Sequence, residues 1–428
     1  MRAAFYECDI TPPLGGNMPG VYRANPAMDV FEPLYAKAVV LEDGGTYAAI
    51  VAIDTCEVDP KFHDVITRRV AEYTGMDPAS VAVHVVHTHK GAPTEHRPEV
   101  GQHFDAAYTD VCMRRAADAI ILAYKRLADG VDVLFGCGTV EGISFNRNYV
   151  VEGGEIRSFS AGGKRLIGTL AGIDPDLPVL TFTKDGRPIG AIVSFACHLA
   201  CTGKEVNGYS GDYAGILSQE LKKRYGPEFV TVFLLGAAGD INHRPNDPKQ
   251  VIPPFHYREM GRILAREAAR VIDTASLPVG GGIAVRKEEI ELPVRLLSLE
   301  EACRQIGKWA EEQAMMRMLN LAYYYTTNTK DRDLLWLQVI RIGKVCLYIM
   351  PGEIYVNFGL RLKRESPFAY TVVVSNSNSY GGYIPTPEAF AEGSDLYEIS
   401  LCEGSRHAPE AGDMMVGRLL EMSRELFE

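Results

Sequence analysis

The residues best suited to chemistry are two histidines, His87 and His89, which are separated by a single threonine. They follow an apolar run whose composition is typical of a buried β-strand. Side chains two residues apart on a strand point to the same face of the sheet. Two imidazoles on one face can bind one metal ion together, or one can bind the ion while the other transfers protons. We therefore predict a metal site centred on residues 87–89.

Three further polar residues also come after apolar, strand-like runs, and they are His198, Asp240 and Glu353. Ligand sites in α/β sheets usually form at the carboxyl ends of strands. A third histidine and a carboxylate would complete a zinc-type set of nitrogen and oxygen ligands. Each residue also has a purely structural interpretation, as a core histidine, a helix cap or a turn residue. Their shared position after strands favours a common site.

The elements that must position these residues alternate between strand-like and helical patterns. Strands are predicted over 36–41, 47–53, 81–87, 190–196 and 230–235, with two more within 334–349. Helices are predicted over 61–73, 106–127, 213–224, 257–273 and 298–325. Residues 141–176, rich in glycine, serine and charge, are predicted to be loop or peripheral hairpin. The alternation indicates an α/β fold, with residues 1–428 in a single large domain and a mixed central sheet flanked by helices.

Composition and charge exclude several classes of protein. The 428 residues are 46% hydrophobic and 23% charged, which is typical of a folded globular chain. The net charge of -11, without any block of Lys and Arg, argues against nucleic acid as a partner. We find no apolar run near the roughly 20 residues that span a bilayer, and no secretory signal. Nine cysteines without a disulfide-like spacing favour a reduced, cytoplasmic protein. The oligomeric state stays open.

Eight short segments stand out along the chain. They are 9–13 (DITPP) with Gly15, 87–93 (HTHKGAP), 146–148 (NRN), 197–200 (CHLA), 210–215 (SGDYAG), 236–242 (GAAGDIN), 351–353 (PGE) and 382–386 (GYIPT), and Tyr397-Glu398 follows them. In this order, the segments resemble the catalytic domain of the neutral/alkaline ceramidases, zinc-dependent amidases that cleave the N-acyl bond of ceramide. The resemblance runs over nearly the whole chain. The family's full-length enzymes carry a further immunoglobulin-like domain, whereas this chain ends soon after the catalytic region.

The resemblance implies a ligand set for one zinc ion. By motif, the ligands are His87, His198, Glu353 and Tyr383. Tyr380 is a competing tyrosine three residues earlier, and Tyr383 is preferred because it lies in the GYIPT match. Outside the family, a tyrosine beside Gly-Gly would be interpreted as an aromatic anchor.

Further residues are expected to act on the substrate or to support the ligands. The resemblance places His89 and Arg147 where the family has groups that handle the substrate amide and its developing charge. Asn242 stands where the family has a serine, in a segment that lines the site. Asp240 and Asp212 are expected to accept the free N–H of a ligating histidine, with helix capping as the alternative.

These residues predict a zinc-dependent hydrolase that cleaves a linear N-acyl bond of a small molecule with a metal-activated water. One alternative is a metal-dependent esterase or deacylase that acts on a soluble, carbohydrate-derived compound. Another is a module that binds a metal or ligand without turnover, which the presence of His89 disfavours. Cys197 and Cys201 flank His198, and we interpret them as buried structural thiols rather than ligands.

Overall fold

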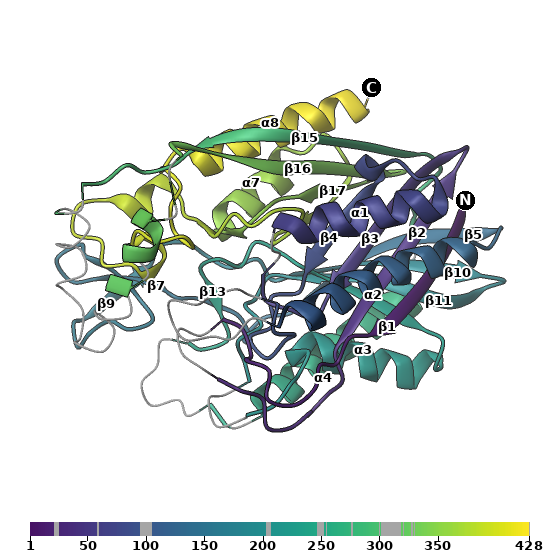
Figure 1. Ribbon diagram of the computed structural model, residues 1–428, viewed down its shortest axis with the longest axis horizontal. Coiled ribbons are helices and arrows are strands. Elements are labelled where there is room, and N and C mark those ends of the chain that lie inside the picture. Colours follow the sequence, from purple (N-terminus) through teal and green to yellow (C-terminus); the bar gives the residue numbers. More distant parts are fainter. Residues whose placement is uncertain are drawn as a thin grey trace.

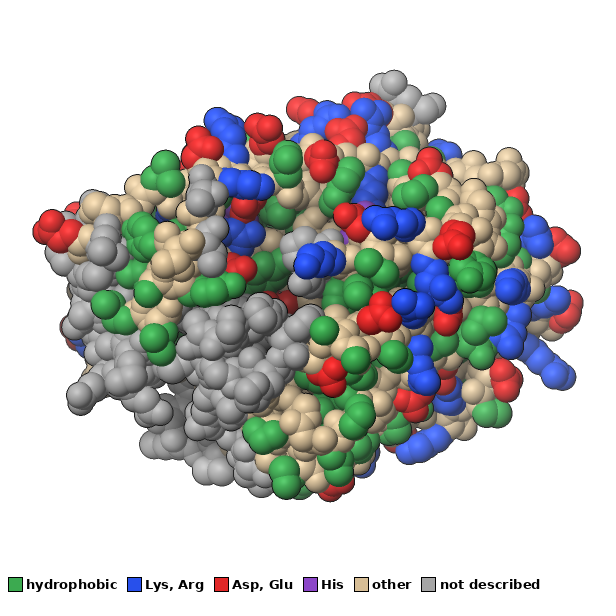
Figure 2. All heavy atoms as spheres, viewed as in Figure 1, with side chains coloured by type: hydrophobic (Ala, Val, Ile, Leu, Met, Phe, Trp, Pro, Cys, Tyr) green, Lys and Arg blue, Asp and Glu red, His purple; other side chains and the backbone are tan. Residues whose placement is uncertain are grey.

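Three β-sheets with helices packed on them form the main body of the fold (Figure 1). The computed structural model describes residues 1–20, 25–57, 60–94, 105–202, 207–245, 252–253, 255–274, 277–298, 300, 318–319, 321–326, 328 and 330–427. Over the coloured part of the face in Figure 2, acidic and basic side chains are interspersed.

The first sheet has four strands in the order β1-β2-β3-β4. They are β1 (Arg2–Asp9), β2 (Tyr35–Asp43), β3 (Thr46–Ile53) and β4 (Val81–Val85). β1, β2 and β3 are antiparallel neighbours, whereas β4 runs parallel to β3. The crossover from β3 to β4 is helix α1 (Pro60–Thr74), and α2 (Ala106–Lys125) also packs on this sheet.

Alternate residues of the first sheet belong to two different hydrophobic cores, because successive side chains of a strand point to opposite faces. Ala38 and Val40 pack in a core with α1 and α2. Val39 and Leu41 pack in a larger core that includes residues of the other two sheets. Both faces of the first sheet are therefore buried, which explains why β2 and β3 read as continuous apolar runs.

The second and third sheets are mixed. The second has the order β12-β11-β10-β5-β14, and the third has the order β15-β16-β17-β19. The strands of the second sheet are β5 (Val131–Thr139), β10 (Asp176–Lys184), β11 (Arg187–Phe195), β12 (Val230–Leu235) and β14 (Leu277–Pro278). Those of the third are β15 (Ile283–Pro293), β16 (Arg332–Ile342), β17 (Val345–Ile349) and β19 (Tyr370–Val374). Four helices accompany them: α3 (Asp212–Tyr225), α4 (His256–Thr274), α7 (Val356–Glu365) and α8 (Ala411–Phe427).

Two short strand pairs carry three of the predicted site residues, Asn242, Glu353 and Tyr383. β6 (Phe145–Asn146) pairs with β13 (Ile241–Asn242) in an antiparallel ladder. β18 (Glu353–Ile354) pairs with β20 (Tyr383–Ile384) in parallel, so that Glu353 lies opposite Tyr383. Residues beyond β6 form a small peripheral sheet of β7 (Asn148–Val151), β8 (Ile156–Ser158) and β9 (Leu166–Thr169).

The predicted mixed α/β architecture is confirmed, although its strands are divided among several sheets rather than collected in one. The predicted strands and helices are present with small changes at their ends, and the peripheral hairpin in 141–176 is confirmed as β7–β9. The long helix predicted over 298–325 falls mostly outside the described residues. Within the part of the chain that the structure describes, no helix combines the length and apolarity needed to cross a membrane.

Candidate metal centre

Three buried side chains from distant parts of the chain bring one donor atom each to a common point. The Nε2 atoms of His87 and His198 lie 3.0 Å apart. The Oε2 atom of Glu353 lies 3.3 Å from the first and 3.2 Å from the second. This triangle of donors is the predicted set of two histidines and one glutamate, and its members are 2%, 2% and 8% exposed.

The triangle has the size that a zinc ion requires. Zinc bonds of about 2.0–2.1 Å at tetrahedral angles place the ligand atoms about 3.3 Å apart. The three edges of 3.0, 3.2 and 3.3 Å match this spacing. In addition, Glu353 Oε2 is buried and, among the described residues, has no hydrogen bond of acceptable geometry. A buried acceptor that faces two imidazole nitrogens is what a shared cation would satisfy.

Backbone carbonyls orient both imidazole rings. His87 Nδ1 lies 2.8 Å from the carbonyl oxygen of Cys56, and His198 Nδ1 lies 3.0 Å from that of Ala238. Each Nδ1 therefore carries a proton and donates it to the carbonyl. The Nε2 lone pairs are consequently left to face the centre of the triangle, as metal-binding histidines require.

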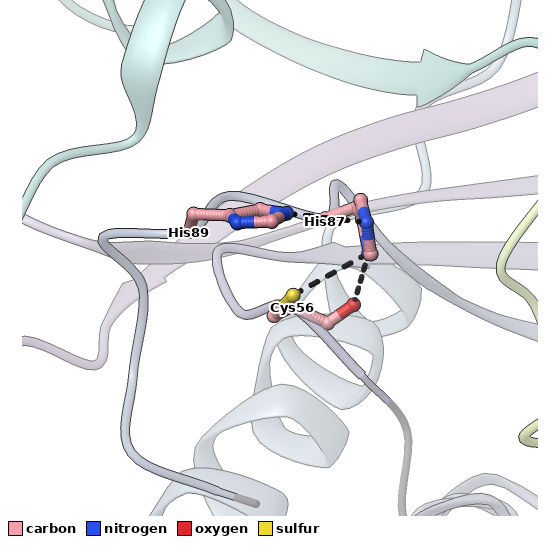
Figure 3. Close-up of side chains that lie close together, drawn as sticks. All are labelled: Cys56, His87 and His89. Carbon is pink, nitrogen blue, oxygen red and sulfur yellow. Dashed lines mark hydrogen bonds between the residues drawn. The ribbon is translucent and has the colours of Figure 1, made fainter. Parts of the chain in front are cut away.

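His87 does not lie on the strand that was predicted to hold it. β4 ends at Val85, and His87 has a φ of 66°, which is uncommon for any residue but glycine. The argument from strand periodicity was therefore wrong, yet the rings of His87 and His89 still meet, with 3.4 Å between their Nε2 atoms. In Figure 3 the ring of His87 lies between His89 and Cys56, the residue whose carbonyl holds it.

Two glycine positions allow the backbones around the site to approach. Gly20 has a φ of 74°, and a Cβ there would lie 2.4 Å from Nδ1 of His89. At Gly239 a Cβ would lie 2.4 Å from the carbonyl oxygen of Glu353. Side chains at these positions would displace one candidate ligand and the neighbouring imidazole.

The hydroxyl of Tyr383 contacts Arg147. The Nη2 atom of Arg147 donates to the Tyr383 hydroxyl at 3.2 Å and to the carbonyl of Gly239 at 2.7 Å. Its Nε donates to Glu398 at 2.7 Å. Tyr380, the competing tyrosine, instead lies against Arg406, whose Nη2 donates to the Tyr380 carbonyl at 2.9 Å.

Glu398 is a functional candidate for which no role was predicted from the sequence. Its side chain is fully buried, and its second oxygen accepts a hydrogen bond from Ser158 Oγ at 2.5 Å. It thus fixes the guanidinium that contacts Tyr383. The Tyr397-Glu398 pair was visible as a match to the family, but 251 residues separate Glu398 from Arg147, so their pairing was not predictable.

The remaining predicted residues lie near the site with other partners. Asp240 accepts hydrogen bonds from the backbone N–H of Val356 at 2.8 Å and from Asn146 Nδ2 at 2.7 Å. Asp212 binds Thr202 and the backbone N–H of Tyr213. The prediction that these aspartates orient the ligating histidines is wrong, because backbone carbonyls do so. Asp240 instead accepts the N–H of the first residue of α7, and Asp212, the first residue of α3, accepts the N–H of the residue that follows it.

Asn242 and the two cysteines contact backbone groups of nearby residues. A role for Asn242 at the substrate stays a prediction. Asn242 is half-buried on β13, and its Oδ1 accepts the backbone N–H of His243 at 2.8 Å. Cys197 and Cys201 are buried, and their Sγ atoms lie near the carbonyl of His198. The interpretation of these two cysteines as core thiols agrees with their positions.

The charge states of the three side chains in the triangle of donors favour the binding of a cation. Burial alone would raise the pKa of Glu353, but His87 and His198 hold it well below its usual range. Burial lowers the pKa of His198 to about 4, so its Nε2 is unprotonated at neutral pH. Burial also opposes a charge on His87, but the carboxylate of Glu353 outweighs it and raises the pKa of that histidine. A bound cation would take the place of the additional proton that this raised pKa favours on His87.

Comparison with known proteins places this geometry in a known fold. No protein-family model and no curated protein matches the sequence. Two solved structures match over 99% of this chain with a TM-score of 0.77 and 20% sequence identity: neutral ceramidase from Pseudomonas aeruginosa and a ceramidase complexed with C2. The chain has the neutral ceramidase fold. This chain covers 74% and 75% of those two chains. Because the match includes 99% of this chain, the similarity is not limited to the sequence motifs.

Within this fold, the two tyrosines can be separated by experiment. We expect Tyr383→Phe to lower activity more than about 100-fold, since it removes a hydroxyl at the site, and Tyr380→Phe to lower it no more than a few-fold. Steady-state rates of the two matched variants, normalised to bound metal, give the comparison. A crystal structure with the Tyr380 oxygen on the metal, and Tyr383 turned away, would reverse the assignment.

Proposed function

We propose that the protein is a zinc-dependent hydrolase that cleaves an N-acyl amide bond of a small molecule. The observation that carries the proposal is the triangle of donors formed by His87, His198 and Glu353. As a fourth ligand we propose Tyr383, whose hydroxyl accepts a hydrogen bond from Arg147. The neutral ceramidase fold supports the same reaction class.

When bound, zinc would polarise the scissile carbonyl and lower the pKa of a water molecule. The residues of the chain have complementary tasks. The ion would be held by His87, His198 and Glu353. These three side chains together carry one negative charge, that of the Glu353 carboxylate. The carbonyls of Cys56 and Ala238 fix the ring orientations. Arg147, held by Glu398 and Gly239, keeps the Tyr383 hydroxyl in place and contributes positive charge for the oxyanion that develops on the substrate.

His89 is the candidate for proton transfer. Its Nε2 lies 3.4 Å from Nε2 of His87, so it faces the same space without completing the triangle. Burial lowers the pKa of His89 well below its usual value. The imidazole is therefore neutral at pH 7 and is able to accept a proton from the nucleophile and pass it to the leaving amine.

The first test is turnover by the zinc-loaded protein. N-acyl compounds and activated esters of the same acyl chain should be compared side by side, because the alternative esterase or deacylase would prefer the esters. We expect the amide to be cleaved with loss of activity on chelation and recovery with zinc. Cleavage of esters alone would favour the alternative, and turnover that survives complete metal removal would contradict the proposal.

Replacement of His89 by alanine tests its role. We expect turnover per mole of bound metal to fall about 10²- to 10⁴-fold, as for loss of a general acid or base, with a changed pH–rate profile. Metal content and melting temperature should stay near those of the wild type, because the proposed ligands remain. Equal activity per metal in folded His89→Ala protein would leave His89 as part of the scaffold.

A further inference from the structure

A pocket lies between the strands β1 and β2 of the first sheet and helix α3, which runs beside β1 in Figure 1. Its volume is about 70 Å³. A single water molecule needs about 10–15 Å³ by the same measure, so the pocket has room for roughly five water-sized groups. Glu7, Tyr35 and Lys37 line it from the sheet, and Gly215, Ser218 and Lys222 line it from the helix.

Lys37 is a buried cation at the wall of this pocket. It is 6% exposed and, within the part of the chain that the structure describes, its Nζ has neither a hydrogen bond nor an ion pair. Tyr35 and Lys37 are two residues apart on β2, so their side chains lie on the same face of the sheet. The Nζ of Lys37 lies 5.4 Å from the centroid of the Tyr35 ring. Both side chains line the pocket, and an acceptor inside it would satisfy the ammonium.

The carboxylates nearest to Lys37 have other partners. Glu7 lies directly opposite Lys37 in the β1–β2 ladder, but its carboxylate pairs with Lys222 of α3. Asp54 acts on Lys37 only from beyond ion-pair distance, and it accepts the backbone N–H of Tyr35 at 2.8 Å. Burial raises the pKa of Asp54, which disfavours its charged form. Two ammonium groups and one carboxylate therefore line the pocket, which leaves one positive charge in excess.

Helix α3 contributes open space and a hydroxyl group. Gly215, Ser218 and Lys222 are spaced by three and four residues, so they lie on one face of the helix. Glycine is less favourable than alanine inside a helix, yet a Cβ at Gly215 would meet no surrounding atom within 4 Å. Packing therefore does not require this glycine, and its missing side chain leaves the pocket open. Ser218 is 5% exposed, and its Oγ has no hydrogen-bond partner among the described residues.

An excess ammonium, an available hydroxyl and room for a few atoms suit a small anion with oxygen acceptors. We propose that this pocket binds a small oxyanion, phosphate or a carboxylate, which accepts hydrogen bonds from Lys37 Nζ and Ser218 Oγ. The side chain of Lys222 is 29% exposed, so the anion enters from solvent beside a second cation. The inference goes beyond the proposed function and is independent of it, because no residue of the triangle of donors lines the pocket.

Binding of inorganic phosphate and of acetate to the purified protein tests the site. Equilibrium dialysis with radiolabelled anions gives the stoichiometry and the dissociation constant. We expect one saturable site for at least one of the two anions, and a Tm that rises with its concentration. Lys37→Met removes the charge and should weaken binding about 10- to 100-fold. Saturable binding of neither anion to the wild type would overturn the site.

Gly215→Ala tests the pocket without a change of charge. The added methyl group would occupy the open space, so anion binding should weaken about 10-fold or more. The Tm without anion should stay equal or rise, because alanine favours the helix. A glycine with a purely structural role would instead give a lower Tm and unchanged binding.

Lys223→Gln is the matched control for charge. Lys223 is an exposed lysine of the same helix that pairs with Glu220 at 2.8 Å and does not line the pocket, so its loss should leave anion binding unchanged. Equal weakening in Lys223→Gln and Lys37→Met would mean that binding follows overall charge, and the site would be wrong. Wild-type affinity in both Lys37→Met and Gly215→Ala would place the anion elsewhere, such as at the metal. If Lys37→Met protein does not fold, Gly215→Ala alone decides.

Discussion

Replacement of His198 by alanine is expected to lower zinc affinity by more than about 100-fold, with a parallel loss of hydrolysis. The change removes one corner of the triangle of donors and leaves Glu353 Oε2 beside a single imidazole, 3.3 Å from His87 Nε2. Metal content after dialysis against a zinc buffer measures the affinity, and turnover at saturating zinc measures whatever activity remains.

A second buried histidine provides the control for this experiment. His84 lies on β4, is 1% exposed, and bonds Ser375 and the backbone N–H of Leu235 rather than the triangle. His84→Asn should lower stability but keep about one zinc per folded molecule. If His198→Ala protein also keeps full occupancy, the ligand assignment fails.

Loss of Glu398 is expected to have the largest effect on stability. Its side chain is 0% exposed and pairs with Arg147, which is 4% exposed. Glu398→Ala would leave that guanidinium buried without its counter-charge, at a cost of about 3–5 kcal/mol in the free energy of unfolding. Denaturant unfolding of wild type and variant, both loaded with zinc, measures the difference.

Two other variants test whether this cost comes from the charge. The double variant Arg147→Met, Glu398→Leu removes both charges and should recover much of the lost stability, although it lacks activity. Arg364→Ala breaks an exposed pair with Glu365 and should change stability by less than about 1 kcal/mol. A Glu398→Ala variant as stable as the wild type would mean that solvent reaches Arg147.

The donor residues of the site were easier to predict from the sequence than the groups that orient them. His87, His198 and Glu353 were identifiable because imidazoles and carboxylates after apolar runs are chemically distinctive. The groups that orient the histidines are the carbonyls of Cys56 and Ala238, and every residue has a carbonyl, so no residue type marks them. The aspartates expected in that role were distinctive in sequence but accept backbone N–H groups in the first turns of helices instead.

In the fold, too, features set by local sequence patterns were predictable, whereas contacts between distant residues were not. Alternating apolar runs predicted most strands and helices because burial on one or both faces imposes a period. Partition of the strands among separate sheets depends on pairings such as Glu353 with Tyr383, which no local pattern contains. The end of β4 at Val85 is another example, because the positive φ of His87 follows from its place in the assembled site.

The three donors are spread along the chain, and this has a consequence for how the protein is made. His87 and His198 are 111 residues apart, and Glu353 comes much later in the sequence. A chain still on the ribosome therefore cannot form the site until most of its length has emerged. In the proposed metalloenzyme, zinc loading would then be one of the last steps of maturation, and the ion would connect segments from early and late parts of the chain and stabilise the folded state.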